Sequence, residues 1–246
     1  MPWNNIMYSI ETKKLTKKFK EKIAVNGIDL KIKEGELFAL LGVNGAGKTT
    51  TIKMLSGLIL PTSGDIKIEN MDMKKDVFKI KEILNVSPQE TAIAPNLSVK
   101  ENLEFMAGVY QIDNKEKKIN ELVKMFKLDE VLNKKAKTLS GGWQRKVSIA
   151  ISLINDPKIL FLDEPTLGLD VIARKELWKI ITSLKGKITI ILTTHYMEEA
   201  ENLSDRIGIM SKGNLVDIGT AKELIKKTKA KNFEDAFVSI ATGGEL

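Results

Sequence analysis

The sequence feature that most constrains the fold is the octapeptide GVNGAGKT at residues 42–49, which fits the pattern G-x-x-x-x-G-K-[ST]. Residues 36–41 before it form a short, nearly unbroken apolar run, which is typical of a strand buried on both faces. Residues 50–57 after it suit a helix that ends at a glycine. A strand, a glycine-rich loop and a helix in this order predict an α/β fold with a phosphate site at the start of the helix.

The chemistry of phosphate binding explains the residue types in this loop. Glycine has no Cβ, so Gly42, Gly45 and Gly47 allow successive N–H groups to point at one anion. The following helix adds the positive end of its dipole at the same place. Lys48 would reach the β- and γ-phosphates, and the hydroxyl of Thr49 would ligate Mg²⁺. The alternative is a glycine-rich turn in a lysine-rich chain, and the flanking strand and helix argue against it.

Composition limits the class of protein. The chain has 246 residues, of which 43% are hydrophobic and 29% charged, as expected of a globular protein with a real core. It contains no cysteine, which excludes disulfides and thiolate metal sites. No apolar run approaches the roughly 18 residues of a membrane span. The amino-terminal residues lack a basic stretch followed by an apolar one, so we expect no signal peptide and a cytoplasmic location.

The net charge of +7 could indicate nucleic acid or an anionic membrane surface as a partner. Nearly all of the basic residues are lysines, and the only arginines are Arg145, Arg174 and Arg206. Sequence-specific DNA-binding proteins rely on arginine for bidentate base contacts. We therefore favour a solvated lysine-rich surface and expect no nucleic-acid partner.

The first part of the chain carries strand signals. Residues 8–15 and 23–32 read as two strands around a lysine-rich turn, and residues 65–69 alternate apolar and polar again. These segments predict a small antiparallel sheet. Phe19 falls in the first turn, where its ring could stack on a nucleobase or could simply cap the small sheet.

Helical signals replace strand signals over residues 90–155. Ser98 and Glu101 have the spacing of a capping box at the start of a helix. Apolar residues over positions 115–126 recur at helical spacing. Strand signals return only near Lys158, so this region is predicted to be an inserted helical lobe.

A second candidate anion site lies inside the helical region. Ser140, Gly141 and Gly142 precede residues 143–150, which read as the start of a helix. They offer a hydroxyl and free N–H groups at a helix N-terminus. An ordinary N-cap followed by a flexible turn is the alternative interpretation.

A buried strand ends in two carboxylates. Residues 159–162 are apolar and lead directly into Asp163 and Glu164. In a protein with a phosphate-binding loop, an acid at such a strand tip holds Mg²⁺ directly or through water. The second acid is then placed to take a proton from an attacking water. A solvated strand end is the alternative.

Two further strands end in polar residues. Gln89 follows the short strand at residues 83–87. His195 is the single histidine of the chain and follows the β-branched strand at residues 187–194. His195 is either an ordinary polar residue or a residue that contacts a γ-phosphate.

These motifs, in this order and spacing, resemble the nucleotide-binding subunits of ATP-binding cassette (ABC) transporters over nearly the full chain. The resemblance implies a P-loop NTPase (RecA-like) core with a mainly parallel sheet, a small antiparallel β subdomain and an inserted helical lobe. By position, residues 42–49 look like the Walker A motif and residues 160–163 like the Walker B motif, with Glu164 as the catalytic base. Residues 139–142 look like the signature, and residues 168–170 look like the D-loop. Gln89 would be the Q-loop residue, His195 the switch histidine and Phe19 the adenine-stacking aromatic.

The resemblance also implies how the chain is divided. Residues 1–246 would form a single ABC ATPase domain. Its parts would be a nucleotide-binding core with the β subdomain (1–89 and 156–220), a helical signature lobe (90–155) and a C-terminal helical tail (221–246).

In this family the protein would be an ATPase that binds ATP and Mg²⁺ and pairs head to tail with a second nucleotide-binding subunit, identical or paralogous. The catalytic residues would be Glu164, His195, Gln89 and Lys48, and the metal ligands Thr49, Gln89 and Asp163. The nucleotide-binding residues would be Phe19, Gly42, Asn44, Gly45, Ala46, Gly47, Lys48, Thr49, Thr50, Ser140, Gly141 and Gly142.

Two segments are most similar to ABC-2-type exporters, namely residues 194–201 and 232–237. The similarity implies an integral membrane permease subunit as partner, contacted through residues 90–97, and a position on the inner face of the cell membrane. One residue departs from the family pattern: Trp143 stands at a signature position that is often glutamine. The serine and second glycine that supply the phosphate contacts are present.

Two other functions fit part of the sequence. A soluble ABC-type ATPase acting on ribosomes or DNA usually carries two cassettes or long coiled coils, and neither pattern occurs here. A non-enzymatic basic binding module is opposed by the joint presence of Lys48, Asp163 and Glu164.

Overall fold

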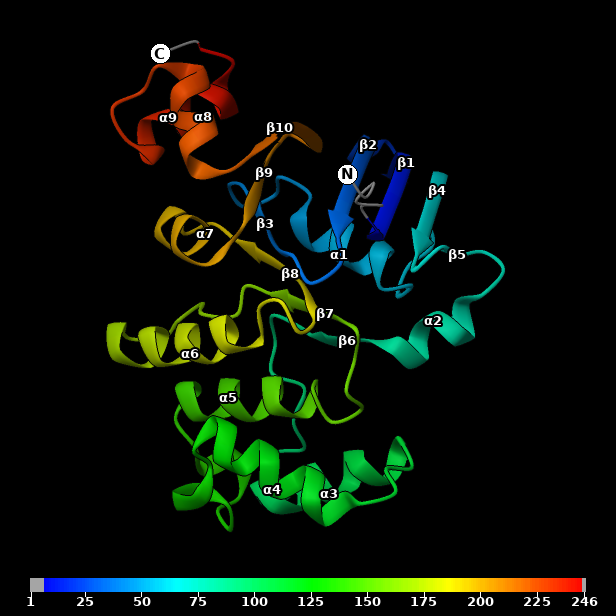
Figure 1. The fold of residues 1–246 in the computed structure, drawn as a ribbon, viewed down its shortest axis with the longest axis vertical. Coiled ribbons are helices and arrows are strands. Elements are labelled where there is room, and N and C mark those ends of the chain that lie inside the picture. Colours follow the sequence, from blue (N-terminus) through cyan, green and yellow to red (C-terminus); the bar gives the residue numbers. More distant parts are fainter. Residues whose placement is uncertain (1–6, 245–246) are drawn as a thin grey trace, which may run out of the picture.

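The computed structural model describes residues 7–244 and contains two sheets, with helices packed around the larger one (Figure 1). The strands are β1 (Tyr8–Phe19), β2 (Lys22–Lys33), β3 (Leu37–Leu41), β4 (Ser63–Ile68), β5 (Met71–Asp72), β6 (Leu84–Ser87), β7 (Ile159–Asp163), β8 (Thr189–Thr194), β9 (Arg206–Ser211) and β10 (Asn214–Gly219). The helices are α1 (Lys48–Leu55), α2 (Val77–Ile83), α3 (Val99–Val109), α4 (Lys115–Phe126), α5 (Gly141–Ile151), α6 (Val171–Leu184), α7 (Met197–Leu203), α8 (Ala221–Thr228) and α9 (Phe233–Thr242), with short 3₁₀ turns at Asp129–Val131 and Ala136–Thr138.

The larger sheet has the order β10-β9-β3-β8-β7-β6 and is parallel except for β10. Its register pairs Leu41 with Thr194 and Asp163 with Thr193. The carboxyl ends of β3, β7 and β8 therefore lie side by side. The glycine loop, the second acid and the histidine all leave the sheet from this one edge.

Alternate residues of the central strands face two separate cores. Phe38 and Leu40 of β3 pack with α1 and the antiparallel sheet. Leu37 and Ala39 belong to the core that includes α3 to α9. Burial on both faces explains why this strand reads as an unbroken apolar run rather than an alternating one.

The smaller sheet is antiparallel, with the order β2-β1-β4-β5. Its first strand continues beyond the predicted end at residue 15 and reaches Phe19. The β1–β2 register shifts between Thr12 and Leu15, and again between Leu15 and Lys18. These irregularities interrupt the apolar alternation, which is why the sequence predicts a shorter strand.

Helices α3, α4 and α5 occupy the region predicted to be helical. Ser98 and Glu101 form the predicted capping box, with N–H to oxygen distances of 3.2 Å and 2.7 Å. In Figure 1, α6 lies between the central sheet and α5, while α8 and α9 cover the far end of the sheet near β10. Across residues 7–244, no helix combines the length and hydrophobicity of a membrane span. The mixed sheet and its helical layers confirm the predicted fold class, and the boundaries of the three parts stay predictions.

Candidate functional site

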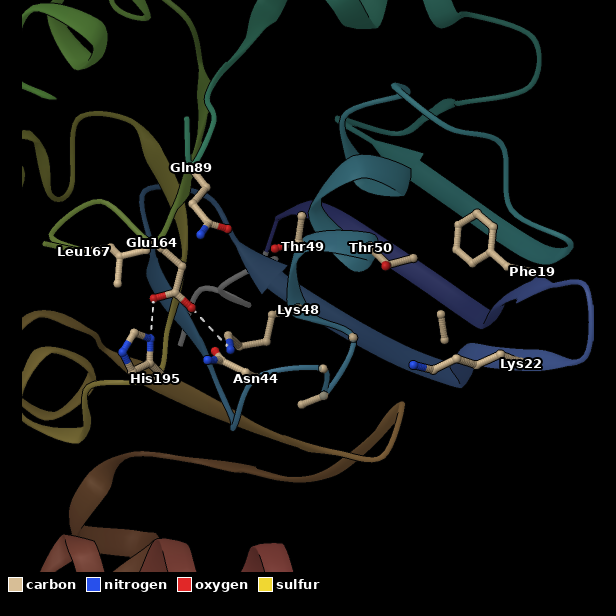
Figure 2. A pocket seen from close by; sticks show the side chains of 14 residues that line it. Phe19, Lys22, Asn44, Lys48, Thr49, Thr50, Gln89, Glu164, Leu167 and His195 are labelled. Atoms are coloured by element: carbon tan, nitrogen blue, oxygen red, sulfur yellow. Dashed lines mark hydrogen bonds and ion pairs between the residues drawn. The ribbon is translucent and has the colours of Figure 1, made fainter. Parts of the chain in front are cut away.

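A cavity of about 550 Å³ opens at the edge where β3, β7 and β8 end (Figure 2). This volume lies within the range typical of small-molecule sites. Both sheets contribute to its walls. The lining residues are Phe19, Lys22, Ala24, Asn44, Gly45, Ala46, Gly47, Lys48, Thr49, Thr50, Gln89, Glu164, Leu167 and His195. The sequence motifs predict all of them as site residues except Lys22, Ala24 and Leu167.

Two glycines of the loop are required by the local backbone. Gly47 has a φ of +106°, and a Cβ there would lie 2.5 Å from the carbonyl oxygen of Ala24. A Cβ at Gly42 would lie 2.4 Å from the carbonyl oxygen of Met210. The loop therefore passes too close to β2 and β9 for any side chain at these positions. Helix α1 begins at Lys48, the residue after Gly47, at the edge of the cavity.

The Lys48 ammonium is held over the loop by several acceptors. Its Nζ donates to the carbonyl oxygens of Gly42 at 2.7 Å and Val43 at 3.3 Å. The same Nζ lies 3.3 Å from Oε1 of Glu164, and both side chains are almost fully buried. The loop thus fixes a positive charge at the cavity wall, where an anion would meet it.

Glu164 lies between the ammonium of Lys48 and the ring of His195 (Figure 2). Its Oε2 is 2.8 Å from Nδ1 of His195. Its backbone has a φ of +49°, which is uncommon for a residue with a side chain and indicates local strain. The N–H of Glu164 donates to the carbonyl oxygen of Thr193 at 3.1 Å and to its hydroxyl at 3.0 Å. These bonds stabilise the unusual turn that aims the carboxylate into the cavity.

Asp163 does not itself line the cavity but contacts Thr49, which does. Its Oδ1 accepts hydrogen bonds from the hydroxyls of Thr49 at 3.0 Å and Thr193 at 2.5 Å. A carboxylate and a hydroxyl in contact are the hard oxygen donors that Mg²⁺ prefers. Among residues 7–244, no group of three or more acidic, histidine or cysteine side chains could hold a metal alone. These residues therefore fit a magnesium ion that also takes phosphate and water oxygens as ligands.

Gln89 reaches the cavity from the end of β6, and a residue of α5 fixes its backbone. Arg145 donates to the carbonyl oxygen of Pro88 at 2.7 Å and to that of Gln89. The guanidinium is buried, and this burial lowers the pKa of Arg145 from its ordinary value. Sequence reasoning counted Arg145 only as one of three arginines, because nothing local indicates a contact across so many residues.

Phe19 lies at the other end of the cavity from His195 (Figure 2). About half of its surface is exposed, and it lines the cavity from the end of β1. The ammonium of Lys17 lies 5.0 Å from the ring centroid. One aromatic face at the cavity wall therefore remains available for a flat ligand group.

The second candidate anion site lies apart from this cavity, since Ser140, Gly141 and Gly142 are not among its lining residues. Ser140 is the N-cap of α5, yet its side chain makes no capping hydrogen bond. A Cβ at Gly141 would meet no atom within 4 Å, so this turn is open. The amide of Gln144 donates to the carbonyl oxygens of Ala136 and Leu139 and thereby holds the segment before the turn.

Comparison with known proteins identifies the family. The model of the ABC transporter family matches residues 25–167. The chain is 40% identical, over 92% of its length, to the probable multidrug ABC transporter ATP-binding protein YbhF of Escherichia coli, but spans only 39% of YbhF. It is 38% identical to the linearmycin resistance ATP-binding protein LnrL of Bacillus subtilis, over 89% of this chain and 71% of LnrL.

Solved structures show the same architecture. An ATP-binding subunit of an ABC transporter superimposes with a TM-score of 0.84 at 27% identity, covering 94% of this chain and 98% of that one. The dimeric structure of MJ0796, a bacterial ABC transporter cassette, gives a TM-score of 0.78 at 28% identity over 86% of this chain and 98% of MJ0796. The chain therefore belongs to the ABC transporter family.

Proposed function

We propose that this chain is an ATPase subunit that closes as a dimer around ATP and powers export through a separate membrane-spanning partner. The observation that carries the proposal is the position of Glu164, whose carboxylate contacts both Lys48 and His195 at the mouth of the glycine loop. Hydrolysis needs a base, a cation for the phosphates and a polar group near the reacting oxygen. Here Glu164 already contacts both Lys48 and His195, so the base lies next to the cation and next to the polar group.

Each side chain then has a definite task. Glu164 polarises the attacking water, and Lys48 binds the β- and γ-phosphates of ATP. His195 and Gln89 contact the γ-phosphate and the attacking water. Thr49, Asp163 and Gln89 would hold magnesium, which supplies neutralising charge to the phosphate oxygens when bound.

Binding of phosphate competes with an interaction inside the chain. Lys48 is committed to Glu164 and to two loop carbonyls, at 2.7–3.3 Å. A phosphate cradled by the loop offers the ammonium a stronger partner. Glu164 would then keep only His195 as a neighbour, so nucleotide binding itself releases the base for its task.

The separation of the two anion sites supports dimerisation. The Ser140–Gly142 turn is open and does not line the cavity that holds Lys48 and Glu164, whereas the glycine loop does. A second copy, turned head to tail, would place its turn against the nucleotide in the first copy's cavity. The dimeric MJ0796 structures, one of them bound to ADP and phosphate, support this arrangement.

The names of two relatives support a membrane partner. YbhF is named as a probable multidrug ABC transporter ATP-binding protein and LnrL as a linearmycin resistance ATP-binding protein. We infer that residues 90–97, which follow Gln89, contact the partner on the cytoplasmic face of the membrane and transmit the nucleotide state. Charge swaps there should abolish transport while basal ATPase activity remains. Recovery with membranes, rather than with ribosomes or nucleic acid, separates this function from that of a soluble ABC-type ATPase.

The decisive experiment is the Glu164→Gln variant. Loss of a general base lowers the rate roughly 10²- to 10⁴-fold, and glutamine keeps the shape of the side chain without its charge. We expect ATP binding at least as tight as in the parent, because Lys48 no longer pairs with a carboxylate, together with almost no hydrolysis and an ATP-dependent dimer in size-exclusion chromatography. Glu34→Gln, an exposed carboxylate before β3, is the control and should hydrolyse ATP at the parental rate. Parental hydrolysis by Glu164→Gln would disprove the assigned base.

A further inference from the structure

Helix α7 begins two residues after His195 and carries three glutamates with different surroundings. Glu198 and Glu201 are exposed, whereas Glu199 has no exposed surface. A fully buried carboxyl group is strongly unfavourable unless hydrogen bonds compensate for the lost water. None of the tasks assigned above uses Glu199, so its burial calls for a separate explanation.

The carboxyl group of Glu199 joins three elements through one oxygen. Its Oε1 accepts hydrogen bonds from the hydroxyl of Thr166 at 2.8 Å and from Nε1 of Trp178 at 3.0 Å. Thr166 lies in the loop that leaves Glu164, and Trp178 lies on α6. Among the residues that the structure describes, Oε2 has no hydrogen-bond partner.

The two donors fix the segment that leaves the base. Thr166 is two residues beyond Glu164, and the segment ends at Asp170, whose side chain caps α6 by accepting from two N–H groups at 2.9 Å. Glu199 therefore ties the start of this loop to α6 and to the helix that follows His195. Glu164 follows β7 and His195 follows β8, and the carboxyl group of Glu199 links the segments that leave these two strands.

Burial is the main cause that raises the pKa of Glu199, and the carboxylate of Glu164 raises it further, while the hydrogen bonds from Thr166 and Trp178 oppose the rise. Oε1 can accept in either protonation state, so the contacts to Thr166 and Trp178 do not depend on the charge of the group.

We infer that Glu199 is a positioning residue, which holds the loop after Glu164 and the helix α6 in register with His195 through its contacts to Thr166 and Trp178. The inference rests on the proposed ATPase function and deepens it. Leu167, the residue after Thr166, lines the same cavity as Glu164 and His195, so the loop that Glu199 holds forms part of the cavity wall.

The test compares Glu199→Gln and Glu199→Leu with the parent and with Glu201→Gln and Glu201→Leu, which change an exposed glutamate of the same helix. Glutamine keeps an acceptor for both donors, so we expect kcat within about threefold of the parent. Leucine keeps the bulk but removes the acceptor. It should lower kcat roughly 10- to 100-fold, as small misplacements of reacting groups do, while KM and ATP affinity change less than about threefold.

Several results would overturn the inference. These are a parental kcat for Glu199→Leu, equal damage by glutamine and leucine, or a loss of ATP affinity as large as the loss of kcat. Thr166→Val gives an independent check, since it should lower kcat in the parent but not further in Glu199→Leu. If Glu199→Leu does not fold, Thr166→Val and Trp178→Phe decide instead. Parental kcat in both would refute the inference.

The same experiment separates this inference from the proposed function. If the parent hydrolyses no ATP, the proposed function fails. If the parent and both Glu201 variants hydrolyse ATP and Glu199→Leu equals them, only the role of Glu199 fails.

Discussion

Lys48 and Glu164 form a buried ion pair across the cavity, with Nζ 3.3 Å from Oε1 and only 6% of each side chain exposed. The pair joins the first residue of α1 to the residue after β7. Since both charges are withdrawn from water, neither can lose its partner without a substantial change in free energy. A ligand that attracts Lys48 must therefore offer negative charge of its own.

Replacing Lys48 should weaken ATP binding. A hydrogen bond to a charged group contributes about 1.5–3 kcal/mol, so Lys48→Ala is expected to raise the Kd for ATP roughly 10- to 100-fold. Isothermal titration calorimetry measures this change. Lys53→Ala, on the exposed face of the same helix, is the matched control and should bind ATP as the parent does. Parental affinity in Lys48→Ala would show that this ammonium does not contact the phosphates.

Two glycine-to-alanine variants should separate folding from function. Gly47→Ala introduces a clash with Ala24 and a strained φ, and should lower Tm by roughly 5–10 °C. Gly141→Ala meets no atom within 4 Å, so its Tm should stay within about 2 °C of the parent.

The methyl group at position 141 would nevertheless project into the open turn that we assign to the second copy's nucleotide. We therefore expect Gly141→Ala to lose ATP-dependent dimerisation in the Glu164→Gln background, with its Tm unchanged. Normal dimerisation would place the partner's contact elsewhere.

Local patterns predict much of this fold. The helix Lys115–Phe126 has the bounds that its sequence predicts, because its apolar spacing and end signals lie within a few residues. Apolar runs that end in polar residues likewise predict the two strands that precede Glu164 and His195. Parallel register then brings the tips together without any further signal.

Long-range partners could not be predicted. Arg145 reaches carbonyl oxygens 57 and 56 residues away, and the hydroxyl of Thr193 reaches Asp163 across 30 residues. Glu199 reads as an ordinary charged residue of an amphipathic helix until α6 and the loop at Thr166 cover it. Burial of a charge is a property of the packed molecule, and its own sequence neighbours do not report it.

Removing the guanidinium of Arg145 should loosen Gln89 rather than the nucleotide. Arg145→Met keeps most of the buried volume but deletes the hydrogen bonds to two carbonyl oxygens, which should destabilise the protein by about 2–4 kcal/mol. Hydrogen–deuterium exchange should become faster at residues 88–92. The kcat should fall about tenfold with ATP affinity retained, because the β7 and α1 contacts remain. Unchanged exchange in this segment would show that other contacts hold Gln89.

Stability should depend on pH through Glu199. The raised pKa of this carboxyl group means that the folded protein binds its proton more tightly than the unfolded chain, whose value is near 4.5. The free energy of unfolding therefore falls as pH rises above 4.5, and stops falling at the pKa of the folded state. Glutamine does not titrate, so Glu199→Gln lacks this contribution to the pH dependence of stability. The stability of Glu199→Gln relative to the parent should thus increase with pH, by at most about 1.4 kcal/mol per unit.

Urea unfolding of both proteins between pH 4 and 8 measures this difference. The charged groups that act on Glu199 include Glu164 after β7 and Arg145 on α5. His195 lies just before α7, and the guanidinium of Arg174 on α6 lies 5.6 Å from the centroid of the Trp178 ring. All four are present in both proteins, so their own titrations largely cancel in the difference. A stability difference that stays constant from pH 4 to 8 would show that Glu199 does not change its proton affinity on folding.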